Sequence, residues 1–398
     1  MATENKKYIP ALRFPEFQND VEWECVIIGD IISTINPPKK LQSSEYKKKG
    51  AFPIVDQSAS YIAGYSDNGD AVIDNNGYNY IVFGDHTCSL KLIDFPFIQG
   101  ADGIKIFKSK ITEVLTEYLY QYIFAHPINS KEYKRHFSDL KEKLLLYPTK
   151  ACEQKKIADC LSSLDKYIDA TKRKLELLKD HKKGLMQRLF PAKGKTIPEL
   201  RFPEFQNDGE WQIVSLGEIT SVVKRRNKSN RSLPIYSINN AEGFVPQSQQ
   251  FAGMDSEARG YDISAYKIIG KHTFAYNPAR INVGSIGYSG ELKDILISSL
   301  YVCFKTVENV DDDFLMCFFN SYIFNQAVES NVEGGIRSYL FYENFSRISI
   351  AIPSLYEQKR IASCVTSIED MIKKSNEQIS FLETHKKGLL QQLFPMIK

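Results

Sequence analysis

The chain has 398 residues, of which 43% are apolar and 25% are charged, and its formal net charge is only +3. These values are ordinary for globular proteins and exclude a disordered or collagen-like chain. The length predicts two to three domains. No apolar run reaches the roughly 18 residues of a membrane span, and the first ten residues lack the apolar stretch of a signal peptide, so no membrane partner is expected.

The seven cysteines form no Cys-x-x-Cys pair, and their odd number indicates neither a disulfide framework nor a zinc site. This pattern favours a reducing compartment, and the predicted location is the cytoplasm. Because the net charge is close to neutral, a nucleic-acid-binding protein would have to be recognised from local clusters of basic residues.

An internal repeat divides the chain into two halves. Residues 12–20, Leu-Arg-Phe-Pro-Glu-Phe-Gln-Asn-Asp, recur unchanged at 200–208, an offset of 188. The only two tryptophans, Trp23 and Trp211, keep the same offset. We interpret both as apolar anchors that join each half to a helix end.

A variable block follows each copy of this motif. Both blocks, roughly 31–147 and 219–352, contain short β-type runs between Gly, Asn and Asp turns, and then an apolar helical stretch. The expected strands include 81–83, 103–107 and 301–304, and the expected helices are 114–124 and 314–324. Each variable block is therefore predicted to be a mixed α/β domain.

A constant block ends each half. Glu-Gln-Lys-Lys-Ile-Ala at 153–158 matches Glu-Gln-Lys-Arg-Ile-Ala at 357–362, and His-Lys-Lys-Gly-Leu at 181–185 matches 385–389. Apolar residues recur in alternating steps of four and three, which predicts a coiled-coil seam. The seam residues are Ile157, Leu161, Leu164, Ile168, Leu175, Leu178, Ile361, Val365, Ile368, Ile372, Ile379 and Leu382.

Each predicted helix has about 38 residues, or ~57 Å at 1.5 Å per residue, and a Phe-Pro pair marks its end. Because the first helix leads from one variable block to the other, a second helix that pairs with it must run back antiparallel. The predicted fold class is α+β, with two mixed α/β domains separated by two long antiparallel coiled-coil helices in a pseudo-two-fold duplication. The predicted segments are 1–150, 151–191, 192–352 and 353–398.

Two different domains on a rigid spacer suit a bipartite ligand such as duplex DNA, whose major-groove faces recur about every 34–36 Å. Basic residues that could neutralise phosphates gather in both variable blocks. They are Lys39, Lys40, Lys47, Lys48 and Lys49 in the first block, and Lys224, Arg225, Arg226, Lys228 and Arg231 in the second. The side chains chosen as possible readers of base edges are Arg280, Asn282 and Arg337.

Three patterns suggest catalysis but lack the partners that catalysis needs. Asn36-Pro37-Pro38-Lys39 resembles a methyltransferase motif, but Lys39 replaces the aromatic residue that would stack on a flipped base. The Glu-x-Lys patterns at Glu45 and Glu132 have no convincing partner aspartate, and no P-loop occurs. His86 and His272 share a short motif at an offset of 186, yet one histidine per block is a poor metal site. We predict no active site and no bound metal.

Taken together, the repeated motifs resemble the specificity subunit of type I restriction-modification systems, over essentially the whole chain. The stretches 52–57, 276–280 and 284–287 are also similar to segments of that family's target-recognition domains. The resemblance implies a non-catalytic DNA-binding subunit. Each variable block would be a target-recognition domain that reads one half of a split, asymmetric site, and the helices would hold the halves at a fixed separation.

The resemblance also implies partners. Two copies of an adenine-specific modification subunit would dock on the duplicated scaffold, and ATP-driven restriction subunits would join for cleavage. S-adenosylmethionine, ATP and Mg are expected on those partners, and no cofactor on this chain. Two alternatives stay open: a coiled-coil adaptor that binds proteins rather than DNA, and a stand-alone methyltransferase-nuclease.

Overall fold

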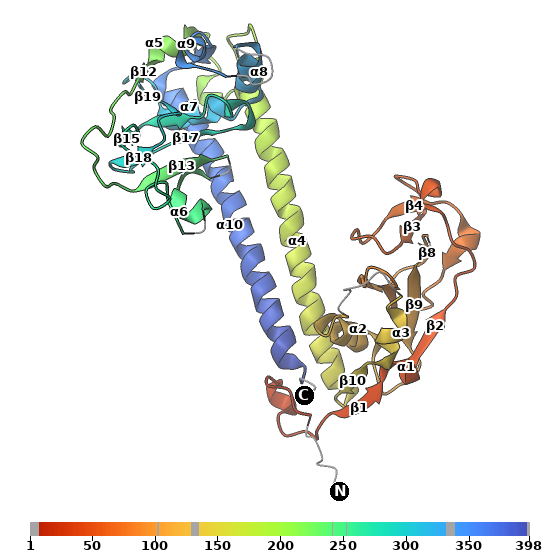
Figure 1. Ribbon diagram of the computed structural model, residues 1–398. Coiled ribbons are helices and arrows are strands. Elements are labelled where there is room, and N and C mark those ends of the chain that lie inside the picture. Colours follow the sequence, from red (N-terminus) through yellow and green to blue (C-terminus); the bar gives the residue numbers. More distant parts are fainter. Residues whose placement is uncertain are drawn as a thin grey trace. The chain divides into compact units, whose positions relative to one another are not determined.

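The computed structural model describes residues 8–101, 103–128, 135–240, 242–251, 253–331 and 339–395. The chain forms two compact units (Figure 1). Unit 1 comprises residues 1–172 and 377–398, and unit 2 comprises residues 173–376. Each unit contains one variable block together with parts of both long helices. The four-segment division of the chain stays a prediction.

Unit 1 contains two four-stranded sheets, in the orders β2-β9-β6-β7 and β4-β3-β8-β5, and the two-stranded sheet β1-β10. Its elements before the first long helix are β1 (Glu24–Ile27), α1 (Ile28–Ile31), β2 (Ile32–Ile35), β3 (Phe52–Val55), β4 (Gly64–Ser66), β5 (Val72–Ile73), β6 (Tyr80–Gly84), β7 (Leu90–Ile93), β8 (Phe97–Gln99), β9 (Ile104–Ser109), α2 (Thr116–Ala125), α3 (Phe137–Glu142) and β10 (Leu144–Tyr147).

Unit 2 has the same three sheets, in the orders β12-β19-β16-β17, β14-β13-β18-β15 and β11-β20. Its elements before the second long helix are β11 (Gln212–Ser215), α5 (Leu216–Ile219), β12 (Thr220–Val222), β13 (Ile235–Asn239), β14 (Gly243–Pro246), α6 (Gln247–Gln250), β15 (Lys267–Ile269), β16 (Phe274–Tyr276), β17 (Ile286–Tyr288), β18 (Ile295–Ile297), β19 (Val302–Thr306), α7 (Asp312–Phe319), α8 (Tyr322–Asn331), α9 (Tyr342–Ser346) and β20 (Ser349–Ile352).

The matching sheet orders confirm that the variable blocks are two copies of one mixed α/β domain. A parallel strand pairing is also shared, because β3 pairs with β8 in unit 1 and β13 pairs with β18 in unit 2. One predicted element is wrong. The helix expected at 314–324 is two helices, α7 and α8, because the Ser321 hydroxyl accepts a hydrogen bond from the backbone N–H of Phe324 (3.2 Å) and thereby caps a new helix.

The two long helices are α4 (Ala151–Leu189) and α10 (Leu355–Leu393), each of 39 residues. Each ends one residue before its Phe-Pro pair, as predicted, because proline cannot continue a helix. All twelve seam residues are buried or half-buried. The polar seam residues Thr171 and Ser375 donate their hydroxyls to carbonyls of their own helices, 2.8 Å away in both cases. No described helix is apolar over enough length to cross a membrane.

Within each unit, the two long helices run in opposite directions. In unit 1, Lys172 pairs with Glu383 at 2.7 Å, whereas the earlier residue Asp165 pairs with the later residue Lys386. In unit 2, Lys182 pairs with Glu369 at 2.6 Å. The same unit packs the end of α4 and the start of α10 into one core, whose members from the two helices are Met186, Leu189, Ile361, Ala362 and Val365.

The repeated motifs form the same buried ion pair in both units. In unit 1, the guanidinium of Arg13 donates to both carboxylate oxygens of Glu153, at 2.7 and 2.8 Å. In unit 2, Arg201 donates to both oxygens of Glu357, at 2.8 Å each. The carboxylate side chains are 1% exposed and the guanidinium side chains 7% and 8%. This pair, hereafter the Arg-Glu clamp, joins each repeated nonapeptide to the first turn of a long helix.

The next residue of each helix fastens it to the variable block. Gln154 accepts a hydrogen bond from the backbone N–H of Leu115 (2.8 Å) and donates to the carbonyl of Pro148 (2.8 Å). Gln358 repeats this arrangement with Asp311 (2.8 Å) and Pro353 (3.0 Å). The Glu-Gln repeat therefore specifies how a helix start is attached to its domain.

The tryptophans are apolar anchors, as predicted. Trp23 packs edge-to-face on Tyr118 at 6.1 Å, in the core that also contains Phe394 at the end of α10. Trp211 packs edge-to-face on Phe190 at the end of α4, at 6.4 Å. Their indoles are buried. Each tryptophan therefore joins its domain to the end of a long helix.

We expect His126 to make the stability of unit 1 dependent on pH. Its ring stacks on Tyr122 at 4.3 Å and lies edge-on to Phe394. Burial lowers the pKa of His126, the hydrogen bond to the Tyr122 carbonyl opposes this, and the charge of Lys143 lowers the pKa further. The folded state therefore binds fewer protons than the unfolded state below about pH 6.5, so the free energy of unfolding should fall as the pH drops from there through the lowered pKa.

Urea unfolding at about pH 7.5 and about pH 5 measures this effect. The variant His126→Phe keeps a ring against Phe394 and removes the titrating group, so its stability should change less between the two pH values. An identical pH dependence in both proteins would contradict the assignment.

Candidate DNA interface

The predicted lysines of unit 1 lie in the exposed segment between β2 and β3. All five, Lys39, Lys40, Lys47, Lys48 and Lys49, are exposed. Lys47 pairs with Asp67 at 2.9 Å, and its backbone exchanges two hydrogen bonds of 2.9 Å with Tyr65. The hydrogen bond from Lys47 lowers the pKa of Asp67, which therefore remains a carboxylate at neutral pH. The segment thus carries more positive than negative charge on a backbone held against β4.

The predicted basic residues of unit 2 occupy the segment between β12 and β13, and all five are exposed. Arg225 and Arg231 both pair with one carboxylate, Asp294, at 3.2 and 3.3 Å. The buried amide of Asn227 holds the segment in shape by donating to the carbonyl of Arg231 (3.0 Å) and accepting from its N–H (2.9 Å). No local sequence pattern indicates Asp294 as their partner, because it lies 69 residues from Arg225 and 63 residues from Arg231 in the chain.

Arg280 and Asn282 lie in the turn between β16 and β17, and both are exposed. The turn is closed by the N–H of Asn277, which donates to the carbonyl of Ser285 (3.0 Å). Gly284 adopts a left-handed conformation with φ of +86°, which a residue with a side chain rarely adopts. The turn therefore presents a forked guanidinium and an amide on a defined backbone. Arg337 lies outside the described residues.

The match between His86 and His272 is not a structural equivalence. His86 follows β6, whereas His272 precedes β16, the strand that takes the place of β6 in unit 2. His272 contacts Glu291 at 3.4 Å and the hydroxyl of Tyr288 at 2.6 Å. The four-residue match in sequence was misleading because insertions shift the register of the two variable blocks.

Of the residues in the possible catalytic patterns, Glu45 has a structural role in the part of the chain that the structure describes. The carboxylate of Glu45 accepts the backbone N–H of Gln42 (2.7 Å) and so caps a short 3-10 helix, Ser43–Glu45. Asn36 to Lys39 form an irregular segment after β2. Glu132 lies outside the described residues. Among the described residues, no group of three or more His, Cys, Asp or Glu side chains could hold a metal ion.

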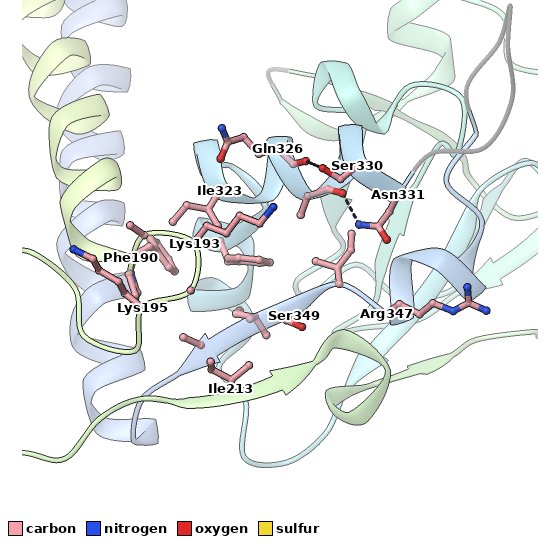
Figure 2. Close-up of a pocket in the computed structure, with 18 residues that line it drawn as sticks. Phe190, Lys193, Lys195, Ile213, Ile323, Gln326, Ser330, Asn331, Arg347 and Ser349 are labelled. Atoms are coloured by element: carbon pink, nitrogen blue, oxygen red, sulfur yellow. Dashed lines mark hydrogen bonds between the residues drawn. The ribbon is translucent and has the colours of Figure 1, made fainter.

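Unit 2 contains a pocket of about 280 Å³ (Figure 2). It lies between the segment after α4, helix α8 and the sheet β11-β20, and its wall is mainly apolar. Ser330 and Asn331 donate their side-chain hydrogen bonds to carbonyls of their own helix, at 2.9 and 2.8 Å. Its described lining residues include no carboxylate, histidine or cysteine. The described lining therefore offers no carboxylate, imidazole or thiol for acid-base or nucleophilic chemistry.

Two copies of one α/β domain, each with an exposed basic segment, define a duplicated recognition protein of the DNA-binding class. The chain belongs to the family described as the type I restriction modification DNA specificity domain, whose model matches residues 20–180 and 208–381. The resemblance to type I specificity subunits is thereby confirmed. The chain acts in DNA target recognition and is not a catalytic subunit.

Similar proteins agree with this family. The chain is 24% identical over 436 residues to the type I restriction enzyme MjaVIII specificity subunit of Methanocaldococcus jannaschii, covering 98% of this chain and 95% of that protein. A second protein of that organism, assigned to the type I restriction enzyme MjaX as its specificity subunit, is 25% identical over 291 residues, covering 69% of this chain and 63% of the relative. The crystal structure of a type I restriction-modification S subunit from M. genitalium has a similar fold, with a TM-score of 0.66, 16% identity, and coverage of 98% of this chain and 100% of that one.

Proposed function

We propose that units 1 and 2 each read one half of a bipartite, asymmetric DNA site. One observation carries this proposal: the same scaffold is built twice, with different exposed faces. The Arg-Glu clamp and the sheet orders are repeated, whereas the basic segments differ, with lysines only in unit 1 and three arginines in unit 2. Two half-sites of different sequence would be read by two domains that share a scaffold but differ in the residues that face DNA.

The two long helices would act as an antiparallel coiled-coil spacer between the half-sites. A helix of 39 residues is about 58 Å long at 1.5 Å per residue, which exceeds one helical turn of DNA. The buried seam and the opposite helix directions within each unit support this role. The spacer would fix the number of base pairs between the half-sites.

Two modification methyltransferase subunits would dock on the duplicated scaffold, and restriction subunits would join them. The repetition of the same sheet orders and of the same attachment to a long helix in both units supports a pair of equivalent docking surfaces. This chain would bind no cofactor, and S-adenosylmethionine, ATP and Mg would be held by the partners. The location in the cytoplasm stays a prediction.

Methylome sequencing of cells that carry this chain and its modification subunit tests the proposal. We expect methyladenine in one split motif, and footprinting of the complex should show two protected patches with a gap. One continuous patch would contradict two separate readers. Failure of the complex to bind any duplex at low salt would favour the adaptor that binds proteins. Binding of S-adenosylmethionine by the isolated chain would favour the stand-alone enzyme.

Asp294 should weaken DNA binding by unit 2, because it neutralises part of the basic segment. In the variant Asp294→Asn, Arg225 and Arg231 lose their carboxylate partner, so we expect tighter binding and a salt dependence that steepens by about one phosphate contact. Titration of DNA into the complex at several salt concentrations measures both. Asp67→Asn is the matched change beside Lys47 in unit 1. Unchanged affinity would show that these arginines lie away from the phosphates.

A further inference from the structure

We propose that the turn Asp85–Cys88 between β6 and β7 is a DNA-reading element of unit 1, in which His86 and Thr87 contact base edges. This inference rests on the proposed function. It assigns to unit 1 the counterpart of the turn that carries Arg280 and Asn282 in unit 2. Sequence comparison did not find this counterpart.

The strands on either side of the two turns are equivalent. β6 and β7 are the last two strands in the order β2-β9-β6-β7, and β16 and β17 are the last two in the order β12-β19-β16-β17. In both sheets the two strands are antiparallel neighbours. Each turn therefore joins the same pair of strands, at the same end, in two equivalent sheets.

Three backbone features align the turns residue by residue. The N–H of Gly84 donates to the carbonyl of Ser89 (2.8 Å), just as Asn277 donates to Ser285 (3.0 Å). The residue before each serine is left-handed, Cys88 with φ of +54° and Gly284 with φ of +86°. The first residue of each turn has an equivalent partner just before a short helix. The carbonyl of Asp85 accepts from the N–H of His136 before α3 (2.8 Å), and the carbonyl of Pro278 accepts from the N–H of Leu340 before α9 (3.0 Å).

The alignment identifies what differs between the turns. The turn of unit 1 has four residues, 85–88, and that of unit 2 has seven, 278–284. The carboxylate of Asp85 is buried and accepts the backbone N–H of Phe137 (2.9 Å), so its charge is directed into the unit. His86 is half-buried and Thr87 is exposed, and these are the side chains that the shorter turn presents.

Gln57 is a positioning residue that holds the turn through hydrogen bonds to its side chains. Its carbonyl accepts hydrogen bonds from the hydroxyls of Thr87 and Ser89, at 3.2 Å each. Its amide and the His86 ring both pack against Gly103, where a Cβ would lie 3.1 Å from the Gln57 nitrogen and 3.3 Å from the ring. The imidazole of His86 can hydrogen-bond to base edges in the major groove, and the Thr87 hydroxyl, whose proton goes to Gln57, can accept a hydrogen bond there.

The test uses the complex of the full chain with its modification subunit, and methylome sequencing reads out the motif. His86→Ala and Thr87→Val should each relax one half of the motif and leave the other half unchanged. The affinity for a duplex with the original half-site should fall by roughly 5- to 150-fold if the contact discriminates bases. Arg280→Ala, in the aligned turn of unit 2, should relax the opposite half.

His272→Ala is the matched control, because sequence alone equates His272 with His86 and the structure does not. It should leave the motif unchanged. The fluorescence of Trp23 reports whether each unit 1 variant folds, and the exposed residue Thr87 keeps the test informative if His86→Ala unfolds.

Folded variants of His86 and Thr87 with an unchanged motif would overturn the inference. So would relaxation of the same half by the His86 and Arg280 variants, or a uniform loss of affinity for all sequences, which indicates phosphate contacts. These outcomes all require that the wild-type complex methylates a split motif. If the wild-type complex fails to do so, the proposed function itself is wrong.

Discussion

Replacing Glu153 with alanine should lower the free energy of unfolding of unit 1 by about 3 kcal/mol. The guanidinium of Arg13 would lose both oxygens of its partner, at 2.7 and 2.8 Å, and remain as an unpaired charge in a site where it is only 7% exposed. It would keep two backbone acceptors, the carbonyls of Asp20 at 2.9 Å and Val21 at 3.2 Å. Two neutral acceptors do not replace a carboxylate that accepts two charge-assisted hydrogen bonds.

The chain allows each unit to be followed separately, because each contains one tryptophan. In a Trp211→Phe background, urea unfolding followed by the fluorescence of Trp23 should show a lower midpoint for Glu153→Ala. In a Trp23→Phe background, Glu357→Ala should do the same for unit 2. Asp159→Ala, which removes an exposed partner of Lys155, is the control with little expected effect. Equal midpoints for Glu153→Ala and this control would show that the clamp does not stabilise the fold.

Deleting residues 166–172 and 378–384 together should shorten the gap in the recognised DNA sequence and leave both half-sites unchanged. Within unit 1 these two heptads lie opposite each other, since Lys172 pairs with Glu383 at 2.7 Å and Tyr167 contacts Gln378. Removing both keeps the remaining seam in register, because a heptad is the repeat of the seam. Seven residues shorten a helix by about 10.5 Å, which corresponds to at most about three base pairs.

The measurement is the methylated motif of cells that carry the double deletion. A single deletion of 166–172 is the control, because it leaves α10 one heptad longer than its partner and should abolish methylation rather than change the spacing. Retention of the original gap by a folded, active double deletion would show that the helices are not the ruler.

The helical part of the fold could be predicted because its signals are local and periodic. The heptad pattern indicated both 39-residue helices, and the Phe-Pro pairs marked their C-terminal ends to within a residue. The duplication was visible because the clamp requires the same residues twice. The reason for that identity was not visible, since Arg13 and Glu153 are 140 residues apart and only the folded chain brings them together.

The recognition surface was less predictable. The basic segments could be proposed as part of this surface because charge clusters are local, and the structure leaves all ten of their residues exposed. The residues around Asp294 form no pattern that would predict its ion pairs with Arg225 and Arg231. The sequence match between His86 and His272 does not reflect equivalent positions. The pairing of whole strands places His86 after β6 and His272 before the equivalent strand β16.

The duplication, the two long helices with their apolar stripe and the family can all be inferred from the order of residues alone, because repeats, heptads and family motifs are local patterns. The folded chain is needed to identify which turn of unit 1 corresponds to the turn with Arg280. That correspondence depends on hydrogen bonds between segments far apart in the chain. For example, the N–H of Asp85 donates to the carbonyl of Gly103, and the carbonyl of Asp85 accepts from the N–H of His136. Insertions erase such relations from a linear comparison, whereas the pairing of strands in a sheet preserves them.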